Sequence, residues 1–224
     1  MDFTRWVPCA ARAKARGTAC RQRCERTSER PAPRGECTRG QPVALRHRAP
    51  DALRREDAVQ GRILVCGGAG FVGAHAAELL ASRGLQVVVL DNLSTGHADV
   101  AARFRSVQVD VRDRAGLDRV LSAEPFDAVV HFAASSIVPH SVADPFPYYD
   151  DNVAGTLGML AAMARHGVRQ IVFSSTAAVF GTPDYTPIDE AHPRKPINPC
   201  GRSKMMVEVM LEDAAAAYGI RSVS

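Results

Sequence analysis

Three glycines and one carboxylate have the spacing that most clearly indicates chemistry in this chain. Gly67, Gly70 and Gly73 stand between a short apolar run and a helix-forming stretch, and Asp91 closes the next apolar run, 18 positions beyond Gly73. Glycines at a strand–helix turn let the backbone approach a pyrophosphate, which the free N–H groups of the helix attract. A carboxylate at the end of the next strand accepts hydrogen bonds from ribose hydroxyls and repels a 2′-phosphate. The pattern predicts a site for NAD rather than NADP; the alternative is a glycine turn with a capping aspartate and no ligand.

The elements that must position these residues alternate between strands and helices. The strands are expected as apolar runs, without the polar alternation of a half-exposed sheet, which indicates a parallel sheet covered on both faces. We therefore expect an α/β fold with a doubly wound, Rossmann-type parallel sheet. The expected strands are 63–66, 87–90, 107–109, 128–132, 170–173 and 221–223, and the expected helices are 74–83, 116–122, 153–165 and 201–218.

The composition divides the chain near residue 60. Residues 1–60 are rich in Arg, Pro and Cys and hold fourteen basic and seven acidic residues, whereas the remainder holds fourteen basic and seventeen acidic residues. A segment without sustained apolar periodicity cannot offset its ordering entropy. We expect residues 1–60 to be a disordered extension and 61–224 to be the NAD-binding domain. The slightly acidic domain argues against nucleic acid as a partner; a basic arm that binds RNA or acidic lipid is the alternative for the extension.

The cysteines and the apolar segments indicate a cytoplasmic protein. Cys9, Cys20, Cys24 and Cys37 lack the paired spacing of a zinc site, so no metal is expected. No apolar stretch reaches the roughly 18 residues that cross a membrane. The N-terminus has no signal-peptide core, and its glutamates are unlike a transit peptide. We expect a reducing compartment and no membrane partner.

Several motifs in residues 62–224 resemble UDP-glucose 4-epimerases, which are extended short-chain dehydrogenases/reductases of the NAD-dependent epimerase/dehydratase family. The wide glycine spacing is that of short-chain dehydrogenases. The epimerase-like segments are Asp91-Asn92-Leu93-Ser94-Thr95-Gly96, Asp110-Val111, His131-Phe132-Ala133-Ala134, Tyr148-Tyr149-Asp150-Asp151-Asn152-Val153, Phe173-Ser174-Ser175-Thr176 and Asn198-Pro199-Cys200-Gly201-Arg202-Ser203-Lys204.

The resemblance implies a role for each matching residue. Phe71 and Val72 would contact the pyrophosphate through their backbones, while Asp91, Asn92, Ser94, Thr95 and Gly96 would hold the adenosine ribose and the nearby phosphate. Asp110 and Val111 would bracket the adenine. Phe132, Ala133, Ala134 and Ser136 would line the nicotinamide side, with Asn152 close by. Thr176 would bond the sugar 4-hydroxyl, and Lys204 the nicotinamide ribose.

The reaction that the resemblance implies is the interconversion of UDP-glucose and UDP-galactose, a step of galactose metabolism. A base takes the proton of the sugar 4-hydroxyl while hydride passes to NAD, the keto sugar turns over, and hydride returns to its other face. The partners implied are a UDP-hexose substrate and, through the helices around 152–165 and 201–218, a second subunit. The alternative for these helices is that they merely cover the sheet.

The sequence departs from the family at Cys200, where the family has its catalytic tyrosine. A helix places positions 200 and 204 on one face, so the backbone suits a Tyr–Lys pair. A thiol ionises more readily than a phenol but lacks its reach, and a general base must approach its proton within about 3 Å, directly or through one water. We expect a strong loss of activity, with Cys200 as a small buried residue; a working thiolate is the alternative.

The chain also ends after a strand expected at 221–223, so we expect the C-terminal substrate domain to be largely absent. The alternatives to an impaired 4-epimerase are an inactive NAD-binding remnant and a related nucleotide-sugar decarboxylase or dehydrogenase. Family dehydratases follow their threonine with Asp-Glu, whereas Thr176 precedes Ala177-Ala178, which argues against dehydration. His131, at the end of a strand, is expected in the core rather than in acid–base catalysis.

Overall fold

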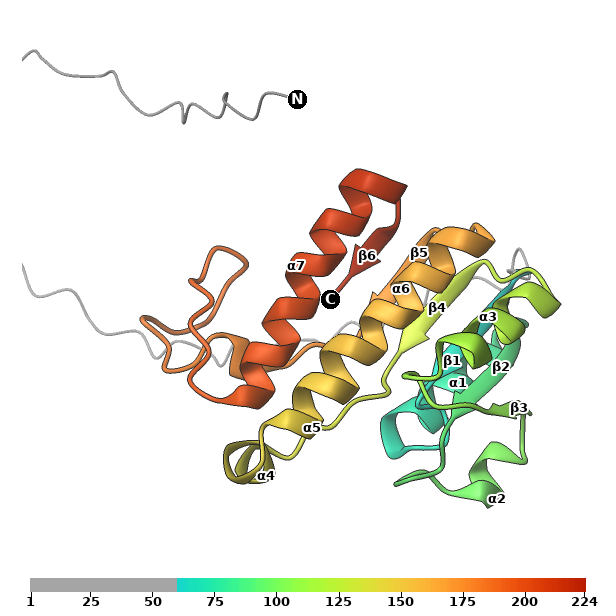
Figure 1. Ribbon diagram of the computed structural model, residues 1–224, viewed down its shortest axis with the longest axis horizontal. Coiled ribbons are helices and arrows are strands. Elements are labelled where there is room, and N and C mark those ends of the chain that lie inside the picture. The colour runs from blue at the N-terminus through green and yellow to red at the C-terminus, as the bar shows by residue number, and fades with distance from the viewer. Residues whose placement is uncertain (1–59) are drawn as a thin grey trace, which may run out of the picture. The chain divides into compact units, whose positions relative to one another are not determined.

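The described part of the chain is built around one parallel sheet (Figure 1). The structure is a computed structural model that describes residues 60–224, so the expectation for the preceding segment lies outside the described residues. Six strands lie in the order β3-β2-β1-β4-β5-β6, and every neighbouring pair is parallel. The strands are β1 (Arg62–Cys66), β2 (Gln86–Asp91), β3 (Arg105–Gln108), β4 (Ala128–His131), β5 (Gln170–Phe173) and β6 (Arg221–Val223).

Helices cover both faces of the sheet, as expected for a doubly wound fold. On one face, α3 (Arg114–Ala123), α6 (Gly155–His166) and α7 (Pro199–Tyr218) pack against the larger apolar cluster. On the other face, α1 (Phe71–Ser82) contributes Ala77 and Leu80 to a smaller cluster. Parallel neighbours need such crossovers, because a hairpin can join only antiparallel strands. The predicted fold class is confirmed.

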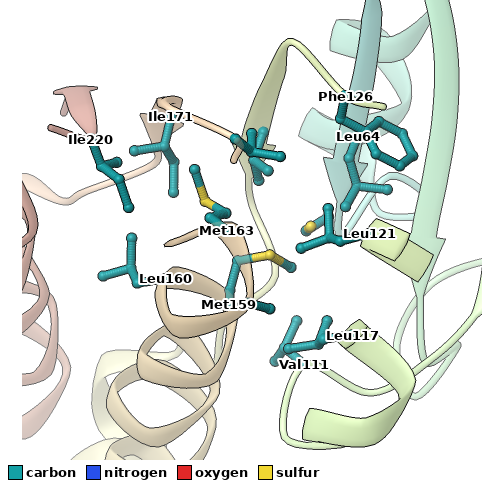
Figure 2. Close-up of a cluster of buried hydrophobic side chains, with 14 of the residues drawn as sticks. Leu64, Val111, Leu117, Leu121, Phe126, Met159, Leu160, Met163, Ile171 and Ile220 are labelled. Carbon is teal, nitrogen blue, oxygen red and sulfur yellow. The ribbon is translucent and has the colours of Figure 1, made fainter. Parts of the chain in front are cut away.

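The larger core consists mainly of aliphatic and sulfur side chains from the sheet and from the helices above it, together with Phe126 and Phe173 (Figure 2). Leu64 of β1 is fully buried, and Met159 and Met163 of α6 lie between the sheet and the adjoining helices. Because these apolar side chains must stay buried in a close-packed core, the core fixes where each strand ends. It thereby fixes where the loops that carry polar residues begin.

Short elements connect the regular ones at the end of the sheet where the glycine turn lies. They are α2 (Ala98–Ala101), α4 (Val138–Ala143), α5 (Phe146–Tyr149), a single π turn η1 (Asp150–Ala154) that leads into α6, and a 3₁₀ turn η2 (Ala177–Val179). None was expected as a separate element, because three to six residues carry too little periodicity to indicate a helix, although the helix expected at 153–165 includes the end of η1. Helix α1 also begins three residues before its predicted start, since the glycine turn passes directly into its first turn.

Candidate dinucleotide-binding site

A cavity of about 780 Å³ opens at the carboxyl ends of β1, β2, β3 and β4. It lies where the strand order reverses, because the chain runs outward from β1 to β3 and then crosses back to β4. Ligands of open α/β sheets bind at such a switch point. Most of the predicted cofactor residues line the cavity: Gly67, Gly70, Phe71, Val72, Gly73, Asp91, Asn92, Ser94, Thr95, Asp110, Val111, Phe132, Ala133, Ala134 and Ser136.

The glycine turn is packed too tightly for side chains at Gly67, Gly68 and Gly73. Gly67 has a φ of +76°, and a Cβ there would lie 2.6 Å from the backbone nitrogen of Ala133. A Cβ on Gly73 would lie 2.8 Å from the carbonyl carbon of Gly67 and from the Cα of Gly68. Gly70 differs, because its Cβ would meet only the Gly67 oxygen, at 3.4 Å. No other atom of the described chain occupies the space beside the Gly70 Cα, and this space is part of the cavity.

The N-terminus of α1 lines this space with Gly70, Phe71, Val72 and Gly73. Gly70 is the N-cap residue and has no side chain with which to cap the helix. The N–H groups of the first turn have no partner within the helix, and the helix dipole adds partial positive charge there. The side chains of Phe71 and Val72 are exposed. An anion in the cavity would be bound by the backbone, as a pyrophosphate is.

Asp91 joins the glycine turn to the loop that follows β2. One of its carboxylate oxygens accepts a hydrogen bond from the Ala69 N–H at 3.0 Å, and the other accepts from the Leu93 N–H at 2.8 Å. Gly96 packs behind this junction, since a Cβ there would lie 2.8 Å from the Cβ of Ala69. Gly96 is absent from the described cavity lining, and it lies close to Ala69 and to the Asp91 carboxylate.

The loop after β4 forms the opposite wall, and Asn152 holds it from behind. The Asn152 side chain, 1% exposed, accepts from the Ser135 N–H at 2.8 Å and donates to the Ser135 carbonyl at 3.0 Å. It also donates to the Ser203 hydroxyl of α7 at 2.9 Å. Within the described chain it is the neighbouring Asp151, not Asn152, that lines the cavity. The resemblance placed Asn152 close to the nicotinamide side, and the structure puts it directly behind the Ser135 wall of the cavity.

The three predicted catalytic residues lie outside the cavity lining. Lys204, 5% exposed, donates from Nζ to the Ser174 carbonyl at 2.8 Å and lies 4.6 Å from the centroid of the Phe173 ring. Burial lowers the pKa of Lys204 to about 8. The Thr176 hydroxyl accepts from the Ala178 N–H at 3.2 Å and caps η2.

Cys200 lies one hydrogen bond behind the cavity wall. Its side chain is 2% exposed, and its thiol donates to the carbonyl of the lining residue Ser136, with 3.8 Å between sulfur and oxygen. Burial raises the pKa of this thiol, and the nearby Lys204 opposes the rise only in part. The side chain is small and buried, as the sequence analysis expects, and its raised pKa does not favour the alternative of a working thiolate.

His131 is a core residue, as its position in the sequence indicated. It is fully buried beside Phe173, and its Nε2 lies 2.9 Å from the Thr156 hydroxyl. Burial, with a smaller contribution from Lys204, lowers the pKa of His131 to about 3. The imidazole therefore stays neutral at physiological pH and lies outside the lining of the cavity.

The sequence analysis missed part of the lining. Arg112 and Asp151 are polar and adjoin predicted site residues, so the sequence could have indicated them as lining residues. The lining residues of α4 and α5 lie in helices too short to show a periodic pattern. The residues that were missed are Leu90, Val109, Arg112, Ser135, Ile137, His140, Asp144, Pro147, Tyr148 and Asp151.

A glycine turn, an uncapped helix and an acidic residue at the end of β2 around one cavity define a dinucleotide-binding domain of the Rossmann type. Residues 63–224 match the model of the NAD dependent epimerase/dehydratase family, and the chain belongs to this family. The expected family is confirmed.

Curated and structural relatives are similar to this chain over about half of their length. A UDP-glucose 4-epimerase of Lacticaseibacillus casei is 48% identical over 163 residues, which cover 72% of this chain and 49% of the relative. A crystal structure of UDP-glucose 4-epimerase from Brucella ovis in complex with NAD aligns with a TM-score of 0.71 at 45% identity, covering 72% of this chain and 50% of that one. The crystal structure of UDP-glucose 4-epimerase from Bifidobacterium longum in complex with NAD⁺ and UDP aligns with a TM-score of 0.67 at 38% identity. The alignment covers 70% of this chain and 49% of that one. The chain therefore spans about half the length of these relatives.

Proposed function

We propose that the cavity binds NAD and that the chain supplies the cofactor-binding half of a nucleotide-sugar 4-epimerase. The observation that carries the proposal is the convergence of the uncapped α1 N-terminus, the open face of Gly70 and the Asp91 carboxylate on one cavity. Similarity to solved 4-epimerases that hold NAD supports it. Asp91 favours NAD, because a carboxylate repels the 2′-phosphate of NADP.

The described residues suit the successive parts of the dinucleotide. Backbone N–H groups at Phe71 and Val72 would bind the pyrophosphate, and Asp91 would bind the adenosine ribose. The wall from Phe132 to Ser136 would face the nicotinamide. NAD, when bound, accepts a hydride and returns it. The work of the chain is to orient the two reactants and to exclude water between them.

The substrate proposed is a UDP-hexose, with interconversion of UDP-glucose and UDP-galactose as the reaction. Thr176 would orient the sugar 4-hydroxyl and Lys204 would bind the nicotinamide ribose. For Cys200, at the position of the family's base, we propose no role in proton transfer, because the thiol is buried and burial raises its pKa. Loss of a general base lowers the rate by about a hundred- to ten-thousand-fold. The activity of this chain should therefore be low.

A second candidate function is NAD binding without turnover. The burial of Cys200 favours it, since within the described chain no acid or base from α7 lines the cavity. A nucleotide-sugar decarboxylase or dehydrogenase remains a third alternative; Ala177-Ala178 after Thr176 argues against dehydration.

A chimera separates the first two candidates. Residues 61–224 would replace the matching half of the Lacticaseibacillus casei relative, once with Cys200 and once with Cys200→Tyr. If the chain is an epimerase impaired at its base, Cys200→Tyr raises the conversion of UDP-galactose to UDP-glucose at least a hundredfold. If both chimeras fold, bind NAD and remain inactive, the epimerase proposal is wrong. That result would support the second candidate function, NAD binding without turnover.

We also propose a homodimer formed through α6 and α7, which lie side by side (Figure 1). Each helix buries one face against the sheet and leaves apolar side chains exposed elsewhere, namely Leu157 on α6 and Met206 and Val209 on α7. Sedimentation of the chain and of Val209→Glu tests this; a wild-type monomer would contradict it.

Among residues 60–224, none of the helices has the length and apolar composition of a membrane span. A cytoplasmic location is proposed because both described cysteines are free thiols.

A further inference from the structure

Arg112 is the centre of a polar network that crosses the candidate cavity. Its guanidinium contacts three carboxylates, and each of the three belongs to a segment at the rim. Two of these, Asp110 and Asp151, line the cavity together with Arg112 itself. The proposed function assigns Arg112 no part.

Asp110 is held by four donors. Arg112 donates from its backbone N–H and from Nε to one oxygen, at 2.8 and 2.9 Å, and from Nη2 to the other oxygen at 2.8 Å. Asn92 Nδ2 donates to that second oxygen, also at 2.8 Å. These hydrogen bonds hold the pKa of Asp110 well below its usual range. A carboxylate has about four lone-pair sites, so this one is saturated and fixed in orientation.

The remaining nitrogen of Arg112 reaches across to the π turn η1. Nη1 lies 3.1 Å from a carboxylate oxygen of Asp150 and 3.1 Å from one of Asp151. The other oxygen of Asp151 accepts from the Ser135 hydroxyl at 2.6 Å. One chain of contacts thus runs from the loop after β2, past the end of β3, through Arg112 to η1 and on to the loop after β4. It joins the wall proposed for the adenosine to the wall proposed for the nicotinamide.

We propose that Arg112 is a positioning residue for the dinucleotide, which fixes both walls of the cavity in their binding positions before the ligand arrives. The inference rests on the proposed function. A planar guanidinium can bridge several carboxylates in a defined geometry, which a lysine ammonium cannot do. Walls that are ordered in advance need not lose conformational freedom on binding, and affinity rises accordingly.

Arg112 has a second effect through its charge. Four aspartates line the cavity (Asp91, Asp110, Asp144 and Asp151), and Arg112 is the one arginine or lysine of the described lining. Without Arg112 the aspartates would repel a pyrophosphate as well as each other. Charge and geometry make different predictions for a lysine at this position, which allows them to be separated.

The test measures NAD binding to the full chain by calorimetry, for the wild type and for Arg112→Gln, Arg112→Lys and Arg165→Gln. Arg165 is the matched control, because it contacts Asp118 through Nε and Nη2 at 2.9–3.0 Å, is similarly exposed, and lies outside the cavity lining. We expect Arg112→Gln to weaken NAD binding about tenfold, the loss expected when side chains must be ordered on binding. Arg112→Lys should restore only part of the affinity. Arg165→Gln should bind as the wild type does, and the unfolding midpoints of Arg112→Gln and Arg165→Gln in urea should be similar.

Three results would overturn the inference while leaving the proposed function intact. One is unchanged binding by Arg112→Gln. The second is full recovery in Arg112→Lys, which would mean that charge alone suffices. The third is an equal loss in Arg165→Gln, which would assign the effect to general stability. A folded wild-type chain that does not bind NAD would instead overturn the proposed function, and this inference with it.

Discussion

Replacement of Gly73 by alanine tests whether the glycine turn is as tightly packed as the structure indicates. An alanine Cβ would clash with the Gly67 carbonyl oxygen and would lie 2.8 Å from the Gly67 carbonyl carbon and the Gly68 Cα, whereas ordinary contact begins near 3.4 Å. All three contacts are with backbone, which cannot rotate away. Overpacking of this kind costs about 1–3 kcal/mol, and we take the upper end. The gain of helix propensity from Gly to Ala is about 1 kcal/mol, so Gly73→Ala should lower the free energy of unfolding by about 2 kcal/mol.

Gly70→Ala is the matched control in the same turn. Gly70 has a φ of −81°, which alanine adopts freely, and its Cβ would meet only one atom, at 3.4 Å. It should leave the free energy of unfolding within about 0.5 kcal/mol of the wild type, as most substitutions without a steric or polar cost do. Its Cβ enters the proposed pyrophosphate space, so NAD binding should fall. Urea unfolding and calorimetry check the pair, and a Gly73→Ala variant that is more stable than the wild type would refute the packing argument.

Three further predictions concern the supports of the site. Asn198→Ala removes the cap of α7, where the side chain accepts from the Gly201 N–H at 2.8 Å, and should cost about 1 kcal/mol in urea unfolding. The pKa of His131 is lowered to about 3 in the fold, so the unfolded chain binds its proton first and stability falls as pH drops from 6.5 towards 3. His131→Gln should make that fall shallower, by up to about 1.4 kcal/mol per pH unit, and an unchanged slope would contradict the burial argument. Iodoacetamide at pH 8 should label Cys200 far more slowly in the folded chain than in urea, by peptide mass spectrometry, because the thiol is buried and its pKa is raised.

The sequence predicted the long elements well and the short ones poorly. The apolar run Ile63–Cys66 is typical of a buried strand and identified β1, and similar runs identified β2, β4 and β5, whereas β3 and β6 are more polar and exposed. Helices α4 and α5 have six and four residues. Their conformation depends on packing against α7, which no local pattern records.

Candidate site residues next to glycines were easier to place than those next to helices. Gly67, Gly70 and Gly73 follow directly from what a turn requires of the backbone. Asp151 and Asn152 are neighbours on a helical turn, where successive side chains differ in direction by about 100°. Asp151 therefore lines the cavity, whereas Asn152 is buried and supports the Ser135 loop from behind. Burial of Cys200 was expected from the sequence, but its hydrogen-bond partners Ser136 and Ser141 lie far away in the sequence and no spacing rule identifies them.

The central claim, that the cavity holds NAD, is tested most directly by calorimetry on the full chain with NAD, with NADP, and with Asp91→Ala as the control. The account predicts that NAD binds, that NADP binds more weakly, and that Asp91→Ala loses most of the affinity, because Asp91 both faces the cavity and joins the two loops through Ala69 and Leu93. Circular dichroism would establish that each sample is folded. A folded wild-type chain that binds no NAD, or an Asp91→Ala variant that binds it as tightly as the wild type, would contradict the account.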